Sequence, residues 1–227
     1  MKNLLLILLM IVLASPTFGQ SKISRQLADF DQLEVRGAFD IYLKPGATNA
    51  IDIEAKGVEP DEITTEVKGN KLIIALDKNN YGRSKRSILY LTYSQLNRIE
   101  WSGAGELWTQ SALIGDKLEL LVTGAGKVVM QLSVKTLHVN MSGAGKVELS
   151  GRVTSQHIQM NGVGAFEGTE LQSETANVQH NGVGTVRVNV TKVLEANASG
   201  IGSILYTGHP KDIKSHDSGF LGKVRPM

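Results

Sequence analysis

Two glutamates and one arginine recur at nearly equal intervals in the second half of the chain. They are Glu148, Glu167 and Arg187, which are 19 and 20 residues apart. Two carboxylates at a defined separation can cleave a glycosidic bond, one as the acid and the other as base or nucleophile. A carbohydrate-active enzyme, either a polysaccharide lyase or a hydrolase, is therefore one function to weigh. The simpler interpretation is an ordinary ladder of surface charges, in which Arg187 or another cation offsets the repulsion between the glutamates.

A second group of regularly spaced residues combines imidazole and amide side chains. Its members are His138, Asn140, His157, Gln159, Gln179 and Asn197. Two histidines in line are ligand types of a metal site, but parallel side chains suit tetrahedral ligation poorly, so we expect no metal ion and no cofactor. The amides are expected to form a hydrogen-bonded ladder. Together these residues predict a flat, polar and nearly uncharged face, which suits weak, water-mediated recognition of a polysaccharide or an envelope protein.

Both groups take their spacing from an internal repeat, in which a G-x-G motif returns every 18 to 21 residues. The six glycine pairs are Gly103 and Gly105, Gly124 and Gly126, Gly143 and Gly145, Gly162 and Gly164, Gly182 and Gly184, and Gly200 and Gly202. Repeats of this length are typical of solenoids, where each repeat forms one coil. A nucleotide-binding loop would need a longer glycine pattern between a strand and a helix. The glycines are therefore interpreted as structural corners.

The residues beside each glycine pair predict strands. Apolar side chains alternate with polar ones, as at Val139 and Met141 before the third pair and Val147 after it. Each coil is then a strand, a glycine corner and another strand, with equivalent strands about 4.8 Å apart. At the corners we expect either a positive φ or a close approach to the next coil. His180 falls in an inward-facing position and is expected in the core.

These patterns predict an all-β, single-stranded parallel β-helix, or β-solenoid, in one continuous domain over residues 20–227. Residues 30–95 also alternate apolar and polar positions but lack the repeat, so they are expected to form irregular first coils. Residues 96–222 are expected to form the regular coils. One helical turn is expected around "EPDEI" at residues 59–63.

The N-terminus and the composition predict an exported protein. Residues 1–19 combine Lys2, an apolar run from Leu4 to Leu13 and small residues before a cleavage point, which is the pattern of a Sec signal peptide. The protein is then periplasmic, cell-surface or secreted. No second long apolar run follows, so no transmembrane segment is expected in the mature chain. There is no cysteine, and the net charge is only +2, which argues against nucleic acid as a partner.

The chain resembles the putative auto-transporter adhesin, head GIN domain family of exported bacterial proteins. The resemblance rests on "LEVRGAFDIYLKPG" (33–46), on "IDIEAKGVEPDEITTEVKGNKLII" (51–74) and on the serial "SGAG" and "NGVG" corners, and it covers residues 30–222. It implies a right-handed parallel β-helix and an adhesin-like role. Because catalysis needs different groups converging on one point while a solenoid repeats its surface, we favour binding over catalysis.

Overall fold

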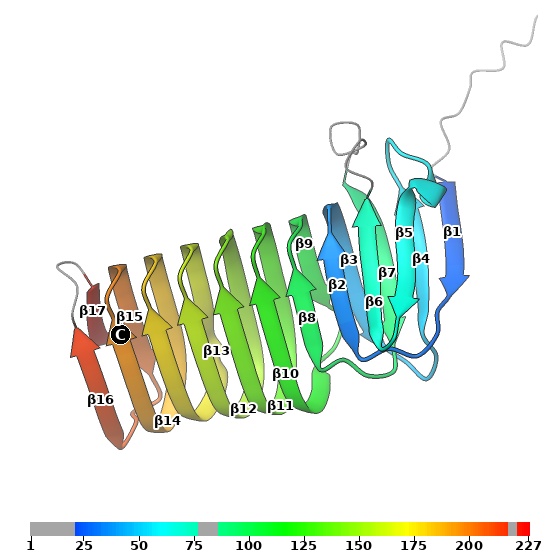
Figure 1. Ribbon diagram of the computed structural model, residues 1–227. Coiled ribbons are helices and arrows are strands. Elements are labelled where there is room, and N and C mark those ends of the chain that lie inside the picture. The colour runs from blue at the N-terminus through cyan, green and yellow to red at the C-terminus, as the bar shows by residue number, and fades with distance from the viewer. Residues whose placement is uncertain (1–20, 77–85, 218–221) are drawn as a thin grey trace, which may run out of the picture.

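The computed structural model describes residues 21–76, 86–217 and 222–227, and it shows an all-β solenoid of about six turns. The predicted signal peptide lies outside the described residues. The strands stack along one axis, from β1 at one end to β16 and β17 at the other (Figure 1). The predicted fold class is therefore confirmed.

The regular coils begin at β8. Their strands are β8 (Arg98–Trp101), β9 (Ala104–Thr109), β10 (Leu113–Val122), β11 (Ala125–Met141), β12 (Ala144–Met160), β13 (Val163–His180), β14 (Val183–Ala198), β15 (Ile201–Thr207), β16 (Asp212–Asp217) and β17 (Gly222–Pro226). Neighbouring coils pair in parallel, and the sequence repeat sets their register: Val139 pairs with Ile158, and Ile158 with Val178. Residues one repeat apart are thus neighbours in space.

Inward-facing side chains of successive coils form columns that make up the core. One column runs through Trp101, Val122, Met141, Met160, His180 and Ala198, all of them buried. Burying one large apolar side chain contributes about 1.5–3 kcal/mol, so the columns dominate the stability of the coils. The last buried member of the column is Ala198. It pairs with Asp217 in the last coil, which is exposed and accepts a hydrogen bond from the Val224 amide over 3.1 Å.

The glycine corners are places where adjacent coils touch through their backbones. A Cβ atom on Gly162 would lie 2.0 Å from the carbonyl oxygen of Gly143, and its φ is not in the left-handed region. Close approach therefore excludes a side chain at this first glycine. At the second glycine of a corner a positive φ can add to the crowding, as at Gly202, where φ is 145°. Close approach therefore occurs at both positions of a corner, whereas a positive φ occurs only at second glycines, namely Gly105, Gly164, Gly184 and Gly202.

The N-terminal part has mixed pairing. Its elements are β1 (Ser21–Gln26), β2 (Gln32–Arg36), β3 (Ala38–Pro45), β4 (Ala50–Ala55), the 3-10 helix η1 (Pro60–Glu62), β5 (Ile63–Lys68), β6 (Lys71–Leu76) and β7 (Ser87–Tyr93). Strand β2 lies between β6 and β8, and β3 lies between β7 and β9, all in parallel. In contrast, β1 pairs antiparallel with β4, β4 with β7, and β5 with β6. The helical turn expected near residue 60 is present as η1.

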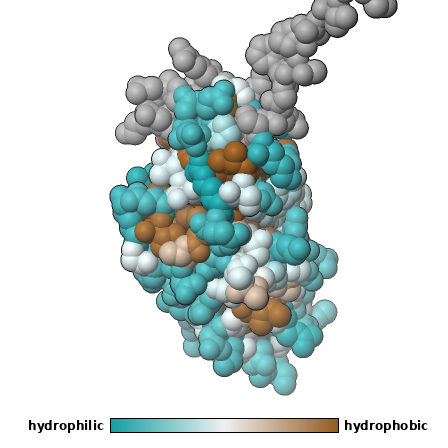
Figure 2. All heavy atoms as spheres, turned by 90° about the vertical axis from the view of Figure 1, so that its right-hand side faces the viewer, coloured by the Kyte–Doolittle hydropathy of each residue, from teal (hydrophilic) through white to brown (hydrophobic). Residues whose placement is uncertain are grey.

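At the N-terminal end of the solenoid, one arginine links three neighbouring elements. Arg25 on β1 donates hydrogen bonds to the carbonyl oxygens of Ile63 (2.7 Å) and Pro60 (2.9 Å) and to the hydroxyl of Thr65 (2.8 Å). It thereby ties β1 to η1 and β5. Figure 2 shows this end as mostly hydrophilic, with small hydrophobic areas among the polar side chains. Charged side chains on this outer strand, such as Lys22 and Arg25, disfavour the addition of a further strand.

Candidate functional site

The imidazole and amide residues lie on one outward face of strands β11 to β14. Because the strands are in register, His138 pairs with His157, and Asn140 with Gln159. Gln179 continues the second row on β13, and Asn197 continues it on β14. We call His138, Asn140, His157, Gln159, Gln179 and Asn197 the polar strip. Asn140, Asn197 and His138 are exposed, and the other three side chains are partly exposed.

The amides of the polar strip do not bond to one another. Among the described residues, no side-chain hydrogen bond joins Asn140, Gln159, Gln179 or Asn197 to a protein group. This differs from the expected amide ladder. Such a ladder forms two residues later instead, where Asn181 donates to Asn161 over 3.0 Å and Ser199 donates to Asn181. The corner amides hold neighbouring coils together, and the strip amides keep their donors and acceptors free for solvent or a ligand.

His138 and His157 lie side by side at the edge of the polar strip. Their ring centroids are 5.7 Å apart and the rings are tilted by 46°. Burial, and then the neighbouring His138, lower the pKa of His157 below its usual 6.5. The neutral form of His157, which can both donate and accept a hydrogen bond, is therefore favoured at pH 7. In the described part of the chain, no three His, Cys, Asp or Glu side chains come together to hold a metal ion.

Ion pairs flank the polar strip at both ends. On the N-terminal side, Lys71 contacts Glu34 (3.2 Å) and Glu100 (3.1 Å). Arg98 links Glu100 (2.9 Å) to Glu119 (2.7 Å). On the C-terminal side, Lys214 pairs with Glu195 over 3.3 Å, and Asn177 donates to the same carboxylate. The strip is thus an uncharged area between two charged areas whose side chains are already paired.

The two glutamates and the arginine form a compensated charge ladder on another face. Glu148 pairs with Glu167 in the strand register, and Glu167 with Arg187. Arg187 contacts Glu167 over 2.9 Å, while Glu148 contacts Lys127 over 3.1 Å and also Lys146. The hydrogen bond from Lys146, helped by Lys127, lowers the pKa of Glu148. A catalytic acid in glycoside cleavage needs a raised pKa, so this arrangement favours the charge-ladder interpretation.

Main-chain contacts explain two predicted features, the glycine corners and the buried position of His180. The six glycine pairs occupy the corners, where the backbones of adjacent coils meet. His180 is fully buried, accepts a hydrogen bond at Nδ1 from the Gly182 amide (3.3 Å) and donates from Nε2 to the Gly184 carbonyl oxygen (3.0 Å). This pattern corresponds to one neutral tautomer. His180 is a core residue, as expected.

Sequence reasoning missed an aromatic stack on the outer surface near the N-terminal end. Tyr42 and Tyr90 stack with ring centroids 5.3 Å apart and an angle of 18° between the ring planes. Tyr42 pairs with Trp108 on the other side. Lys127 lies 5.1 Å from the Trp108 ring centroid and Lys22 lies 5.9 Å from that of Tyr90. The two tyrosine rings cover one face of each other, and Lys22 and Lys127 lie over the rings of Tyr90 and Trp108, so these contacts stabilise the coils. No repeat links these residues, so the sequence carried no signal for it.

Comparison with known proteins identifies the relatives of this fold. Residues 29–210 match the family described as putative auto-transporter adhesin, head GIN domain. The chain belongs to this family. A crystal structure of a putative adhesin from Bacteroides fragilis is similar with a TM-score of 0.83 and 26% identity, over 92% of this chain and 98% of that one. Curated proteins gave no significant match.

Two further crystal structures of similar fold come from Parabacteroides distasonis. A putative adhesin has a TM-score of 0.71 and 18% identity, over 91% of this chain and 96% of that one. A putative lipid binding protein has a TM-score of 0.66 and 20% identity, over 90% and 96%. At these identities the likeness shows the fold alone. Membership of the head GIN domain family supports an adhesin-like role. No helix within residues 21–76, 86–217 and 222–227 has the length and apolarity needed to cross a membrane.

Proposed function

We propose that this head GIN domain protein is an exported, non-catalytic binding protein of the cell envelope that holds an extended polysaccharide or a protein surface against its polar strip. The observation that carries the proposal is the set of free amides. Four in-register amides, about 4.8 Å apart, present side-chain donors and acceptors that make no hydrogen bond to any residue the structure describes. The corner amides beside them are bonded to each other.

The chemistry of the polar strip favours weak binding distributed over many contacts. Amides and neutral imidazoles both donate and accept, so they can replace the water that hydrates sugar hydroxyls. Each exchange gains little free energy, because a protein–ligand hydrogen bond replaces a hydrogen bond to water. Affinity then depends on how many coils one polymer contacts. Export through the predicted signal peptide would bring the strip to the periplasm or the cell surface.

The proposal is tested with the mature protein, beginning after residue 19, on gels containing neutral glucans, pectins or host glycans. We expect retarded migration with at least one polysaccharide and no new reducing or unsaturated ends. The double variant Gln159→Ala with Gln179→Ala should lose the retardation. Gln131→Ala removes an exposed amide from a different face and should keep it. Turnover of a polysaccharide that Glu148→Gln or Glu167→Gln abolishes would support the enzyme instead.

N-terminal sequencing of protein from the envelope fraction tests the export part separately. A new N-terminus near residue 20 is expected. Recovery of the mature protein with Met1 intact would contradict cleavage of the predicted signal peptide.

A further inference from the structure

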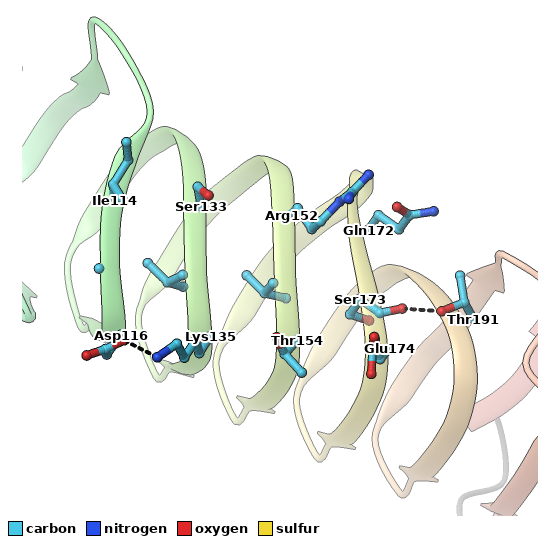
Figure 3. Close-up of a pocket in the computed structure, with 13 residues that line it drawn as sticks. Ile114, Asp116, Ser133, Lys135, Arg152, Thr154, Gln172, Ser173, Glu174 and Thr191 are labelled. Carbon is cyan, nitrogen blue, oxygen red and sulfur yellow. Dashed lines mark hydrogen bonds and ion pairs between the residues drawn. The ribbon is translucent and has the colours of Figure 1, made fainter.

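A groove runs along the solenoid axis on the face next to the polar strip. It lies between two rows of outward side chains, and its floor is formed by the intervening residues Gly115, Val134, Val153 and Ser173. Figure 3 shows the rows crossing successive coils, one with Ile114, Ser133, Arg152 and Gln172 and the other with Asp116, Lys135, Thr154 and Glu174. Members of a row lie in register, since Ser133 pairs with Arg152, and Arg152 with Gln172.

The charges in this groove cancel except at one residue. Lys135 contacts Asp116 over 2.7 Å, and Lys192, just outside the groove, contacts Glu174 over 2.7 Å. Arg152 is exposed and has no hydrogen-bond or ion-pair partner within the described residues. A guanidinium group offers a planar fork of donors that matches a carboxylate in two parallel hydrogen bonds. The groove therefore presents one unused anion-binding group.

Neutral hydrogen-bonding groups surround Arg152. Ser133 and Gln172 are its neighbours in the same row, and Thr154 lies two residues later in the opposite row. None of these three side chains makes a hydrogen bond within the described residues. Ile114, at the start of the row, is 80% exposed and offers an apolar surface. The combination of one cation, several hydroxyl and amide groups and one apolar side chain fits a sugar ring that carries a carboxylate.

We propose that this groove binds a single extended chain of an acidic polysaccharide, with a uronate carboxylate held by Arg152. The groove repeats every coil, about 4.8 Å, which is close to the length of one pyranose unit in an extended chain. An extended peptide presents side chains to one face about every 6.6 Å, so its groups would not keep step with the coils. The inference rests on the proposed function, because it assigns a sugar class to a polysaccharide-binding protein.

The test compares two soluble oligosaccharides that differ in the carboxylates: a β-1,4-linked mannuronate hexasaccharide and the neutral mannohexaose. Binding to the mature protein is measured by calorimetry at low salt. We expect the mannuronate to bind more tightly. Arg152→Gln should weaken that binding by about tenfold or more, since a charge-assisted pair of hydrogen bonds is lost, and should leave mannohexaose binding unchanged. Arg152→Lys keeps the charge without the fork and should restore part of the affinity.

Two controls distinguish binding in the groove from attraction by net charge and from binding of any acidic polymer. Arg225→Gln removes an exposed arginine in the last coil that has no ion-pair partner among the described residues, and it should leave mannuronate binding unchanged. An equal loss in Arg152→Gln and Arg225→Gln would mean that binding follows net charge alone, which overturns the groove. Equal affinity for a hexaglutamate peptide would overturn the sugar class.

The polar-strip double variant distinguishes failure of this inference from failure of the proposed function. Mannuronate binding that is lost in Gln159→Ala with Gln179→Ala, but kept in Arg152→Gln, would overturn the groove and support the strip. Absence of mannuronate binding would overturn the groove even where neutral glycans are retained, in which case the proposed function stands. Absence of binding to every glycan would overturn the groove and the glycan part of the proposed function together.

Discussion

Asn181 donates a side-chain hydrogen bond to Asn161 across 3.0 Å, from one coil to the next. Two residues earlier on the same coils, Gln179 and Gln159 also lie in register and make no such bond. The same chemical group thus has two roles at neighbouring positions. At the corner it joins coils, and on the polar strip it is left free. This difference is what supports a binding face on an otherwise repetitive surface.

The glycine corner gives the sharpest stability prediction. Gly162→Ala should already destabilise the protein by at least about 1–3 kcal/mol, because its Cβ would lie 2.0 Å from the Gly143 carbonyl oxygen and the coils would have to separate. Gly162→Val should destabilise the protein more than Gly162→Ala does. Val163→Ala, at the exposed residue of the same corner, should change stability by about 0.5 kcal/mol or less. Chemical denaturation measures all three, and an unchanged midpoint for Gly162→Ala would contradict the close approach.

The compensated charge ladder predicts a pH-dependent stability. Lys127 and Lys146 face each other in the strand register, and Glu148 contacts both. Glu148→Gln should lower stability at pH 7 by about 1 kcal/mol or less, because these side chains are partly exposed. The pKa of Glu148 is lowered by folding, so its contribution is present above the usual glutamate pKa and lost as pH falls through the lower folded value.

Thermal melts from pH 7 to pH 3 check this sign. The difference between native protein and Glu148→Gln should shrink as the pH falls. Glu170→Gln, at an exposed carboxylate with no ion pair within the described residues, is the matched control and should show little difference at any pH. A stability difference between native protein and Glu148→Gln that grows as the pH falls would mean that Glu148 does not stabilise the lysine pair.

The histidine pair predicts a proton titration that depends on both residues. The pKa of His157 should lie below 6.5 in the folded protein, mainly because of burial and in part because of His138. His138→Gln should raise this pKa part of the way back, since only the charge of the neighbour is removed. NMR titration of the imidazole signals measures it. Because the folded pKa is lowered, the unfolded chain binds the proton first, and His157 reduces stability as pH falls below about 6.5. An unchanged pKa in His138→Gln would contradict the contact.

The buried His180 should behave as a core residue. His180→Met places there the residue that the same column has at Met141 and Met160, so stability should change by less than about 1.5 kcal/mol. His180→Ala leaves a cavity and should cost about 2 kcal/mol or more. Glycan binding should be unchanged in the Met variant. A folded His180→Met protein that no longer binds glycans would give this histidine a functional role.

The features that follow from the repeat could be predicted from the sequence. Residues such as Val139 and Ile158, 19 positions apart, become neighbours as soon as the coils stack, so the inward columns, the glycine corners and the in-register polar strip all follow from one spacing. The charge ladder follows in the same way. The sequence did not predict which amides bond to each other. In-register spacing permits a hydrogen-bonded ladder both at the corners and on the polar strip, and only the local side-chain geometry selects the corners.

The remaining features depend on tertiary structure because they join residues that no period connects. Strand β2 comes to lie between β6 and β8, and this placement brings Lys71 to Glu34 and Glu100. Likewise Tyr42 meets Tyr90 only because β3 pairs with β7. The groove, in which Arg152 is the one charged side chain without a partner among the described residues, depends on which surface charges find partners. Local periodicity determines the coils, whereas long-range pairing and the matching of individual charges are settled only when the chain has packed.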